Sequence, residues 1–231
     1  MSNTSHQQGA DRTTRLARGA KVSGNSGKLV SPERATALLE AIIEPGDRVT
    51  IEGDNQKQAD FLAAALAKAN PERLHDLHMV QSVLALPDHL AVFERGIANR
   101  LDFAFAGQQS RKLAELVTNG TVKIGAIHTY LELYARMLVD LSPRVALIVA
   151  DKADRDGNLY TGPNTEDTPT IAEARPFAAA LSWRRSTRSS TSCRASTSPA
   201  TGSISSCRAP SPTRSSPCSR AIRPRSGTKT C

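Results

Sequence analysis

The stretch Gly46–Gln58, with the sequence GDRVTIEGDNQKQ, decides the fold. Its β-branched run Val49–Ile51 is typical of a strand, and Gly53–Asn55 is a tight polar turn. From Ala59 onward, apolar residues recur every three or four positions, which is typical of a helix. The stretch therefore predicts a strand, a polar loop and a helix. In an open parallel sheet, ligands bind where such loops leave the carboxyl ends of the strands.

The same alternation of strands and helices continues to residue 150. Val145–Ala150 is the most apolar run in the chain, and such a run suits a strand that is buried on both faces of a parallel sheet. Short turns, with Gly or Pro at many of them, separate the elements. We therefore predict an α/β fold, with a mostly parallel sheet flanked by helices. Further strands are expected at Leu74–Val83, Leu101–Ala106, Val122–Ile127 and from Leu159, and helices at Ser31–Ile43, Pro87–Gly96, Leu113–Val117 and Leu131–Leu141.

Positive charge is concentrated at the C-terminal end of the chain. Residues 182–231 hold 10 of the 30 Lys and Arg and none of the 22 Asp and Glu, so residues 1–181 hold 20 basic and 22 acidic residues, a net charge of −2. All four cysteines also lie in this tail, and a cysteine-free body is consistent with a reducing compartment. The chain has no apolar run of about 18 residues and no apolar segment near its N-terminus. We therefore expect a cytoplasmic protein without a membrane span.

Composition divides the chain into three segments. Residues 1–28 are polar with little apolar content, and we expect a disordered or loosely docked arm. Residues 29–180 carry the α/β pattern. Residues 181–231 contain 15 Ser and show neither the strand nor the helix period, so we expect a disordered tail.

The tail has two explanations. One is a basic, disordered segment that binds nucleic acid. We favour out-of-frame translation, because Arg, Ser, Thr, Cys and Pro are what a GC-rich gene yields in a shifted frame. Codons compatible with the run from Trp183, read one nucleotide earlier, can spell a string with amphipathic segments and a Pro-Gly turn. The chain would then be a truncated, frameshifted product. The cysteines have no Cys-x2-Cys spacing, so we expect no zinc site.

Several segments of residues 30–180 carry a family resemblance. They resemble the α subunit of biotin-independent malonate decarboxylase, an acetyl-S-ACP:malonate ACP transferase of the coenzyme A transferase superfamily. The segments are EGDNQKQADFL at Glu52–Leu62, LHDLHM at Leu74–Met79, GAIHTYLELYAR at Gly125–Arg136, GNLYTG at Gly157–Gly162 and NTEDTP at Asn164–Pro169.

The resemblance implies an activity in malonate catabolism. The family exchanges acetate for malonate on the phosphoribosyl-dephospho-CoA prosthetic group of an acyl carrier protein, and companion malonyl-ACP decarboxylase subunits then decarboxylate the malonyl thioester. It also implies a coenzyme A transferase-like first domain, with no cofactor bound directly. Such exchange favours a glutamate that attacks the thioester to form a mixed anhydride, with backbone N–H donors stabilising the tetrahedral intermediate. In coenzyme A transferases this glutamate usually lies in the second half, so we expect the chain to be inactive alone.

Two strand-to-helix loops supply candidate contacts to the substrate or prosthetic group. A glycine allows the backbone to turn or to approach a ligand closely, and Lys57 offers charge to a phosphate or to malonate. The alternatives are a solvated lysine and ordinary helix caps. The candidates are Gly53, Asp54, Asn55, Gln56 and Lys57 in the first loop and Gly107, Gln108, Gln109 and Ser110 in the second.

Three further polar residues follow later strands. His128 ends one strand, with a hydrogen-bonded structural histidine as the alternative. Asn164 and Glu166 lie in the last resembling segment, and Glu166 is the in-chain candidate for a catalytic carboxylate, although Thr165–Asp167 also fits a plain turn. His75 and His78 would point to opposite faces of a strand, which makes them a poor metal pair. We expect no metal site.

Two other functions remain open from the sequence. The first is another coenzyme A or carrier-protein transferase, such as a citrate lyase α-like subunit. The second is a non-catalytic binding module whose basic tail contacts nucleic acid, although we expect no nucleic-acid partner because we interpret the tail as out-of-frame. An assay that compares malonate with citrate as the acceptor distinguishes the first alternative. A nucleic-acid affinity that falls steeply with salt concentration would indicate the second.

Overall fold

The computed structural model describes residues 3–23, 30–53, 58–150, 152–153, 159–160, 167–174, 179–184 and 206–207. Its centre is a sheet of seven described strands in the order β4-β3-β2-β1-β5-β8-β9, and every neighbouring pair in it is parallel. The strands are β1 (Arg48–Ile51), β2 (Leu77–Val83), β3 (Ala98–Phe105), β4 (Lys123–Ile127), β5 (Val145–Ala150), β8 (Ala179–Arg184) and β9 (Ser206–Cys207).

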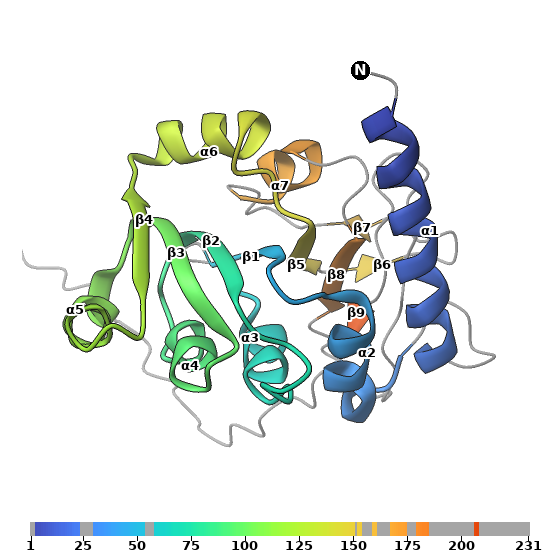
Figure 1. Ribbon diagram of the computed structural model, residues 1–231, viewed down its shortest axis with the longest axis horizontal. Helices are drawn as coiled ribbons and strands as arrows, with labels where there is room; N and C mark the ends of the chain where they lie inside the picture. The colour runs from blue at the N-terminus through green and yellow to red at the C-terminus, as the bar shows by residue number, and fades with distance from the viewer. Residues whose placement is uncertain are drawn as a thin grey trace, which may run out of the picture.

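Helices cover both faces of this sheet (Figure 1). In the view of Figure 1, α3 and α4 lie below the sheet, whereas α6 and α7 lie above it. The helices are α1 (Asn3–Ser23), α2 (Ala35–Ile42), α3 (Asp60–Ala67), α4 (Asp88–Glu94), α5 (Ser110–Thr118), α6 (Tyr130–Val139) and α7 (Thr168–Ala174), with short 3-10 helices η2 (Pro32–Arg34) and η3 (Gly107–Gln109). The prediction of an α/β fold with a mostly parallel sheet is confirmed.

Two apolar cores lie on the two faces of the sheet. In the larger core, every second side chain along β1, β2, β3 and β5 packs against α2, α3 and α4. The smaller packs the alternate positions against α6 and α7, through residues such as Val80, Leu133, Met137 and Ile148. All six residues of β5 are buried, as its apolar run predicts. Because successive strand residues point to opposite faces, polar residues at these alternate positions lie beneath α6 and α7.

A small antiparallel pair stands apart from the main sheet. It joins β6 (Lys152–Ala153) to β7 (Leu159–Tyr160), so the strand expected from Leu159 is present. The expected boundary between body and tail at residue 180 falls inside β8, which pairs with β5 as far as Arg184. Beyond Arg184 the structure describes only β9, and the rest of the proposed tail lies outside the described residues.

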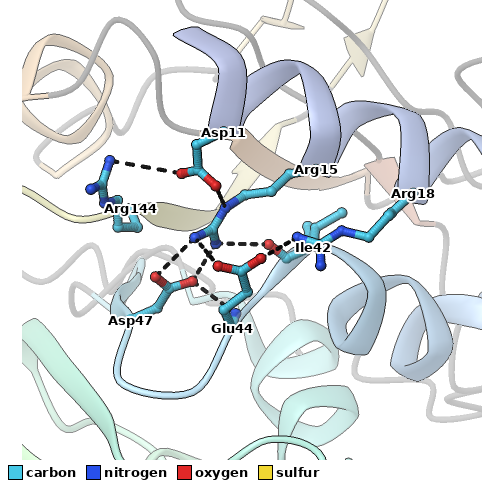
Figure 2. A network of polar contacts seen from close by, with 7 residues as sticks. All are labelled: Asp11, Arg15, Arg18, Ile42, Glu44, Asp47 and Arg144. Atoms are coloured by element: carbon cyan, nitrogen blue, oxygen red, sulfur yellow. Dashed lines mark hydrogen bonds and ion pairs between the residues drawn. The ribbon is translucent and has the colours of Figure 1, made fainter. Parts of the chain in front are cut away.

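The expectation of a disordered or loosely docked N-terminal arm is wrong for residues 3–23, which form α1. Arg15 anchors this helix (Figure 2). Its guanidinium donates hydrogen bonds to the Ile42 carbonyl oxygen at 3.0 Å, to Glu44 at 2.8 Å, to Asp11 at 2.9 Å and to Asp47. The helix contacts the domain through the buried Arg15 and through Leu16 and Val22, which pack against the larger core. Composition hid this helix because so few apolar residues make these contacts.

Arg15 is a buried, fully paired cation. Burial alone would lower the pKa of Arg15, but its hydrogen bonds to Asp47 and Asp11 and their negative charges raise it above the ordinary value. The Asp47 side chain is also buried, and its carboxylate can only accept hydrogen bonds. It therefore depends on Arg15 and on the backbone N–H of Glu44, 2.8 Å away, for compensation. Removing one partner of such a pair leaves an uncompensated buried charge.

We predict that Arg15→Ala lowers the free energy of unfolding by about 3 to 5 kcal/mol, because Asp47 loses its buried counter-charge. Chemical denaturation followed by circular dichroism measures this loss. Arg18→Ala is the matched control on the same helix: the Arg18 side chain is 39% exposed and pairs with Glu44, so its loss costs about 0 to 1 kcal/mol. Equal losses in the two variants would contradict the role of Arg15 as anchor.

Candidate functional site

Two buried carboxylates lie at the carboxyl ends of β1 and β2, where the first candidate loop begins. Glu52 directly follows β1, and its side chain is fully buried. Its Oε2 accepts a hydrogen bond from the Val149 backbone N–H at 2.6 Å, and its Oε1 accepts one from the Thr168 hydroxyl. The backbone carbonyl of Glu52 accepts from the N–H of Ala59 at 2.9 Å. Glu52 therefore joins β1, β5 and α7 at the base of the loop.

Asp167 is the second buried carboxylate, and it accepts hydrogen bonds from three other parts of the chain. Its Oδ2 accepts from the Ser82 hydroxyl of β2 at 2.5 Å and from the backbone N–H of Gly53 at 3.4 Å. Its Oδ1 accepts from the Tyr134 hydroxyl of α6 at 2.6 Å. A carboxylate that accepts several hydrogen bonds orients all of its donors at once. Asp167 thus connects the loop after β1 to β2 and α6.

Gly53 lies too close to its neighbours for any side chain. A Cβ at this position would lie 2.7 Å from the Val83 carbonyl oxygen and 2.9 Å from Cε1 of His89. Gly53 also forms an antiparallel bridge with Gln58, which closes the base of the loop. The sequence predicted that this glycine allows close approach of the backbone. In the structure, the group that it approaches is the end of β2 together with the ring of His89.

His89 is buried behind this glycine. Burial lowers the pKa of His89 to about 4, and the neighbouring Val83 backbone and the charge of Asp60 offset this only in part. The ring is therefore neutral at pH 7. It serves as packing against the loop base rather than as a charged group.

A third polar cluster lies on the face of the sheet under α6. The buried carboxylate of Asp102 on β3 accepts from His78 Nε2 at 2.6 Å and from His128 Nε2 at 2.9 Å. Gly125 makes room for it, because a Cβ there would lie 2.0 Å from Asp102 Oδ2. Glu132 Oε1 lies 3.2 Å from the other ring nitrogen of His128. The ring of His128 thus lies between two carboxylates, and its assignment as a substrate contact stays a prediction.

Ionisation in this cluster is set by competing effects. Burial alone would raise the pKa of Asp102, but the hydrogen bonds and charges of His128 and His78 lower it below its usual value. Burial lowers the pKa of His78, and its contact with Asp102 offsets this only in part. His75 lies before β2 and contacts Asp76 at 2.8 Å, so it does not share a site with His78.

We predict that stability falls as the pH falls from 6.5 towards 4. A histidine whose pKa is lower in the folded than in the unfolded state resists protonation, so the unfolded state binds more protons in this window. For His89 the drop from 6.5 to about 4 corresponds to on the order of 3 kcal/mol. Denaturation at several pH values measures the slope.

His89→Leu removes the titrating ring at this position, so it should flatten that slope. Part of the slope should remain, because the pKa of His78 is lowered as well. A slope identical to that of the wild type would contradict the account of His89.

The second candidate loop lies two strands away from the first. Gly107, Gln108 and Gln109 form η3 at the end of β3, and Ser110 begins α5 with its hydroxyl donating to the Gly107 carbonyl oxygen at 2.6 Å. The left-handed conformation of Gly107, at φ +52°, accounts for glycine there. No described contact joins these residues to Gly53, and their assignment as contacts to the substrate or prosthetic group stays a prediction.

The other predicted site residues lie outside the described residues. They are Asp54, Asn55, Gln56 and Lys57 of the first loop, together with Asn164 and Glu166. Sequence reasoning missed Glu52, Ser82 and Tyr134, and it treated Asp167 only as part of a turn. The available signals were weak: a charged residue directly after a β-branched strand, and an acidic residue directly before a helix.

The described residues were compared with the requirements of a metal site and of a membrane-spanning helix. Its His, Cys, Asp and Glu side chains form no group of three or more that could hold a metal ion. No helix in the described ranges is both long and apolar enough to span a membrane.

Comparison with known proteins identifies the family. Residues 4–185 match the family model described as "Malonate decarboxylase, alpha subunit, transporter". The chain belongs to this family. It is also 57% identical over 150 residues to the acetyl-S-ACP:malonate ACP transferase of Malonomonas rubra. The aligned stretch covers 65% of this chain and 27% of that protein.

Solved structures agree with this family. A malonate decarboxylase α subunit from Acinetobacter baumannii matches with 43% identity and a TM-score of 0.74, covering 77% of this chain and 33% of that one. A Pseudomonas malonate decarboxylase hetero-tetramer in complex with malonate matches with 46% identity and a TM-score of 0.75, covering 80% and 34%. RipA from Yersinia pestis, at 14% identity and a TM-score of 0.55, shares the fold alone. The chain thus spans about a third or less of the length of its malonate decarboxylase relatives.

Proposed function

We propose that the chain provides a coenzyme A transferase-like first domain of an acetyl-S-ACP:malonate ACP transferase. The observation that carries this proposal is the match of residues 4–185 to the malonate decarboxylase α family, supported by 57% identity to the Malonomonas rubra transferase. The substrates would be malonate and the acetyl thioester on the phosphoribosyl-dephospho-CoA group of an acyl carrier protein. The partners would be that carrier protein and malonyl-ACP decarboxylase subunits, in the cytoplasm.

The loop after β1 is the part of this domain that we assign to the prosthetic group. Its base is fixed on both sides, by the hydrogen bond of Gly53 to Asp167 and by that of Ala59 to the Glu52 carbonyl. Asp54–Lys57 lie between these two anchors in the sequence, and we assign them the polar and charged contacts. A loop held rigidly at its base loses less conformational freedom when a ligand binds, which favours affinity.

The catalytic nucleophile is proposed to be a glutamate in the part of the longer relatives that this chain does not match. Its carboxylate oxygen would attack the acetyl carbonyl carbon, forming a mixed anhydride as the C–S bond breaks and the carrier thiolate leaves. Glu52 is unsuited to this step, because its side chain is buried and both of its oxygens accept hydrogen bonds. Glu166 remains the in-chain candidate.

We predict that the chain binds a phosphoribosyl-dephospho-CoA analogue but does not catalyse acetate–malonate exchange on the carrier protein alone. Isothermal titration calorimetry should show Lys57→Ala weakening binding on the order of tenfold, because one charge contact is lost. Lys68→Ala, exposed at the end of α3, is the matched control and should bind as the wild type does. Absence of binding by the wild type, or robust exchange by the chain alone, would contradict the proposal.

The tail is proposed to be the product of a frameshift. The family match ends at residue 185, close to the point where the Ser- and Arg-rich sequence begins. Resequencing the gene across codons 175–190 should therefore reveal a single-nucleotide insertion or deletion that restores a long open frame. This proposal would be contradicted if the new gene sequence is unchanged, has a stop codon directly after the Cys231 codon, and has no open reading frame that continues the family sequence.

A further inference from the structure

Four basic residues lie side by side across four neighbouring strands. The strand register pairs Arg48 of β1 with His78 of β2, His78 with Arg100 of β3, and Arg100 with Lys123 of β4. We call Arg48, His78, Arg100 and Lys123 the basic row. Like charges that lie directly opposite each other on neighbouring strands destabilise a sheet. The row therefore weakens the sheet, which points to a role other than stability.

The side chains of the basic row lie on the face of the sheet that α6 partly covers. The Arg48 guanidinium donates a hydrogen bond to a backbone carbonyl oxygen at the end of α6. Arg100 Nε lies 3.9 Å from Oδ2 of Asp102 on the same face. Lys123 is two residues before Gly125, which lies beside the Asp102 carboxylate, so both point to this face. The Arg100 side chain is 55% exposed and Lys123 is also exposed, so this part of the face is open to solvent.

Counter-charges in the described part of the chain compensate the row only in part. Asp102 is the described carboxylate that pairs with it, through His78 Nε2 at 2.6 Å and Arg100 Nε at 3.9 Å. The Asp102 side chain is only 3% exposed and also pairs with His128. Burial lowers the pKa of His78, and the nearby positive charges of Arg100 and Arg48 lower it further. One buried carboxylate thus faces three permanent positive charges.

Structural roles explain single members of the row but not the row as a whole. A lysine on an end strand, as Lys123 is on β4, hinders the edge-to-edge association of sheets. Arg48 and Arg100 lie on the interior strands β1 and β3, where that explanation does not apply. The Asp140 carboxylate near Arg48 is already bonded by Arg136 through two hydrogen bonds of 2.6 Å. The row therefore has the character of a binding surface for negative charge.

We propose that the basic row binds an acidic segment of a partner protein, with its carboxylates on one side. Neighbouring strands are about 4.8 Å apart, so Arg48 and Lys123 are separated by about 14 Å across three gaps. Three carboxylates at alternate positions of an extended segment span about 13 Å, which matches this length. Complementary charges of this kind steer the encounter and select the partner.

Two other anionic ligands fit the row less well. Small ligands such as a single phosphate bind in concave sites, whereas the row lies on an exposed sheet face and spreads over four strands. A nucleic acid longer than the row would meet the rest of residues 1–181, whose net charge is −2. The row also lies towards the amino ends of the strands, away from Glu52 and Gly53 after β1. This inference therefore does not rest on the proposed transferase function.

Carbodiimide cross-linking of the whole chain tests the proposal. The reagent joins a carboxylate to a nearby lysine Nζ as an amide, and the probe is N-acetylated octaglutamate. Mass spectrometry reports the yield at each lysine separately, so binding of the probe to the basic tail does not obscure the row. Lys123 is the reporter, and Lys68 is the control, exposed at the end of α3 on the other side of the sheet. We expect a yield at Lys123 at least about tenfold above that at Lys68.

Arg100→Gln should lower the yield at Lys123 several-fold and leave the yield at Lys68 unchanged, because one charge of the row is lost. Arg111→Gln on α5, whose side chain is 93% exposed, is the matched control and should change neither yield. Equal yields at Lys123 and Lys68 in the wild type would overturn the proposal. Protection of Lys123 by inorganic pyrophosphate or by an oligothymidylate, at lower concentrations than octaglutamate needs, would overturn it in favour of a phosphate ligand or a nucleic acid.

Discussion

The buried carboxylate of Asp167 is the interaction on which the candidate site depends. It receives hydrogen bonds from Ser82, Tyr134 and the N–H of Gly53, which come from three different elements. Burying a carboxylate costs free energy unless donors compensate it, so the three elements are held in the arrangement that supplies these donors. The position of the loop after β1 follows from this constraint. Glu52, bonded to Val149 and Thr168, fixes the other side of the same loop.

The fold could be predicted from the sequence because it rests on local periodicity and apolar runs. The β-branched residues before Glu52, the run Val145–Ala150 and the helical spacing after Ala59 each identify one element, and their alternation implies a parallel sheet. Helix α1 could not be predicted in this way, because Arg15 docks it through ion pairs with Glu44 and Asp47, about thirty positions away. A pairing between distant residues leaves no periodic signal in a single sequence.

The site was predicted less completely for the same reason. The glycine at position 53 was visible as a turn residue, but its close neighbours Val83 and His89 come from other elements. Asp167 and Tyr134 are 33 residues apart, and only folding brings them to 2.6 Å. His128 was visible at a strand end, but the sequence did not show that its ring pairs with the buried Asp102. Polar residues at strand ends thus mark a region of the sheet and not the role of each side chain.

Hydrogen exchange at the backbone amide of Gly53 tests the central role of Asp167 most directly. In Asp167→Ala the amide loses its acceptor and the loop base loses its link to Ser82 and Tyr134. The account predicts much faster exchange at Gly53 and at its bridge partner Gln58, while the amides of β1 keep their protection because β1 stays paired with β2 and β5. Unchanged exchange at Gly53 in this variant would show that the loop is held by other contacts, and it would contradict the account.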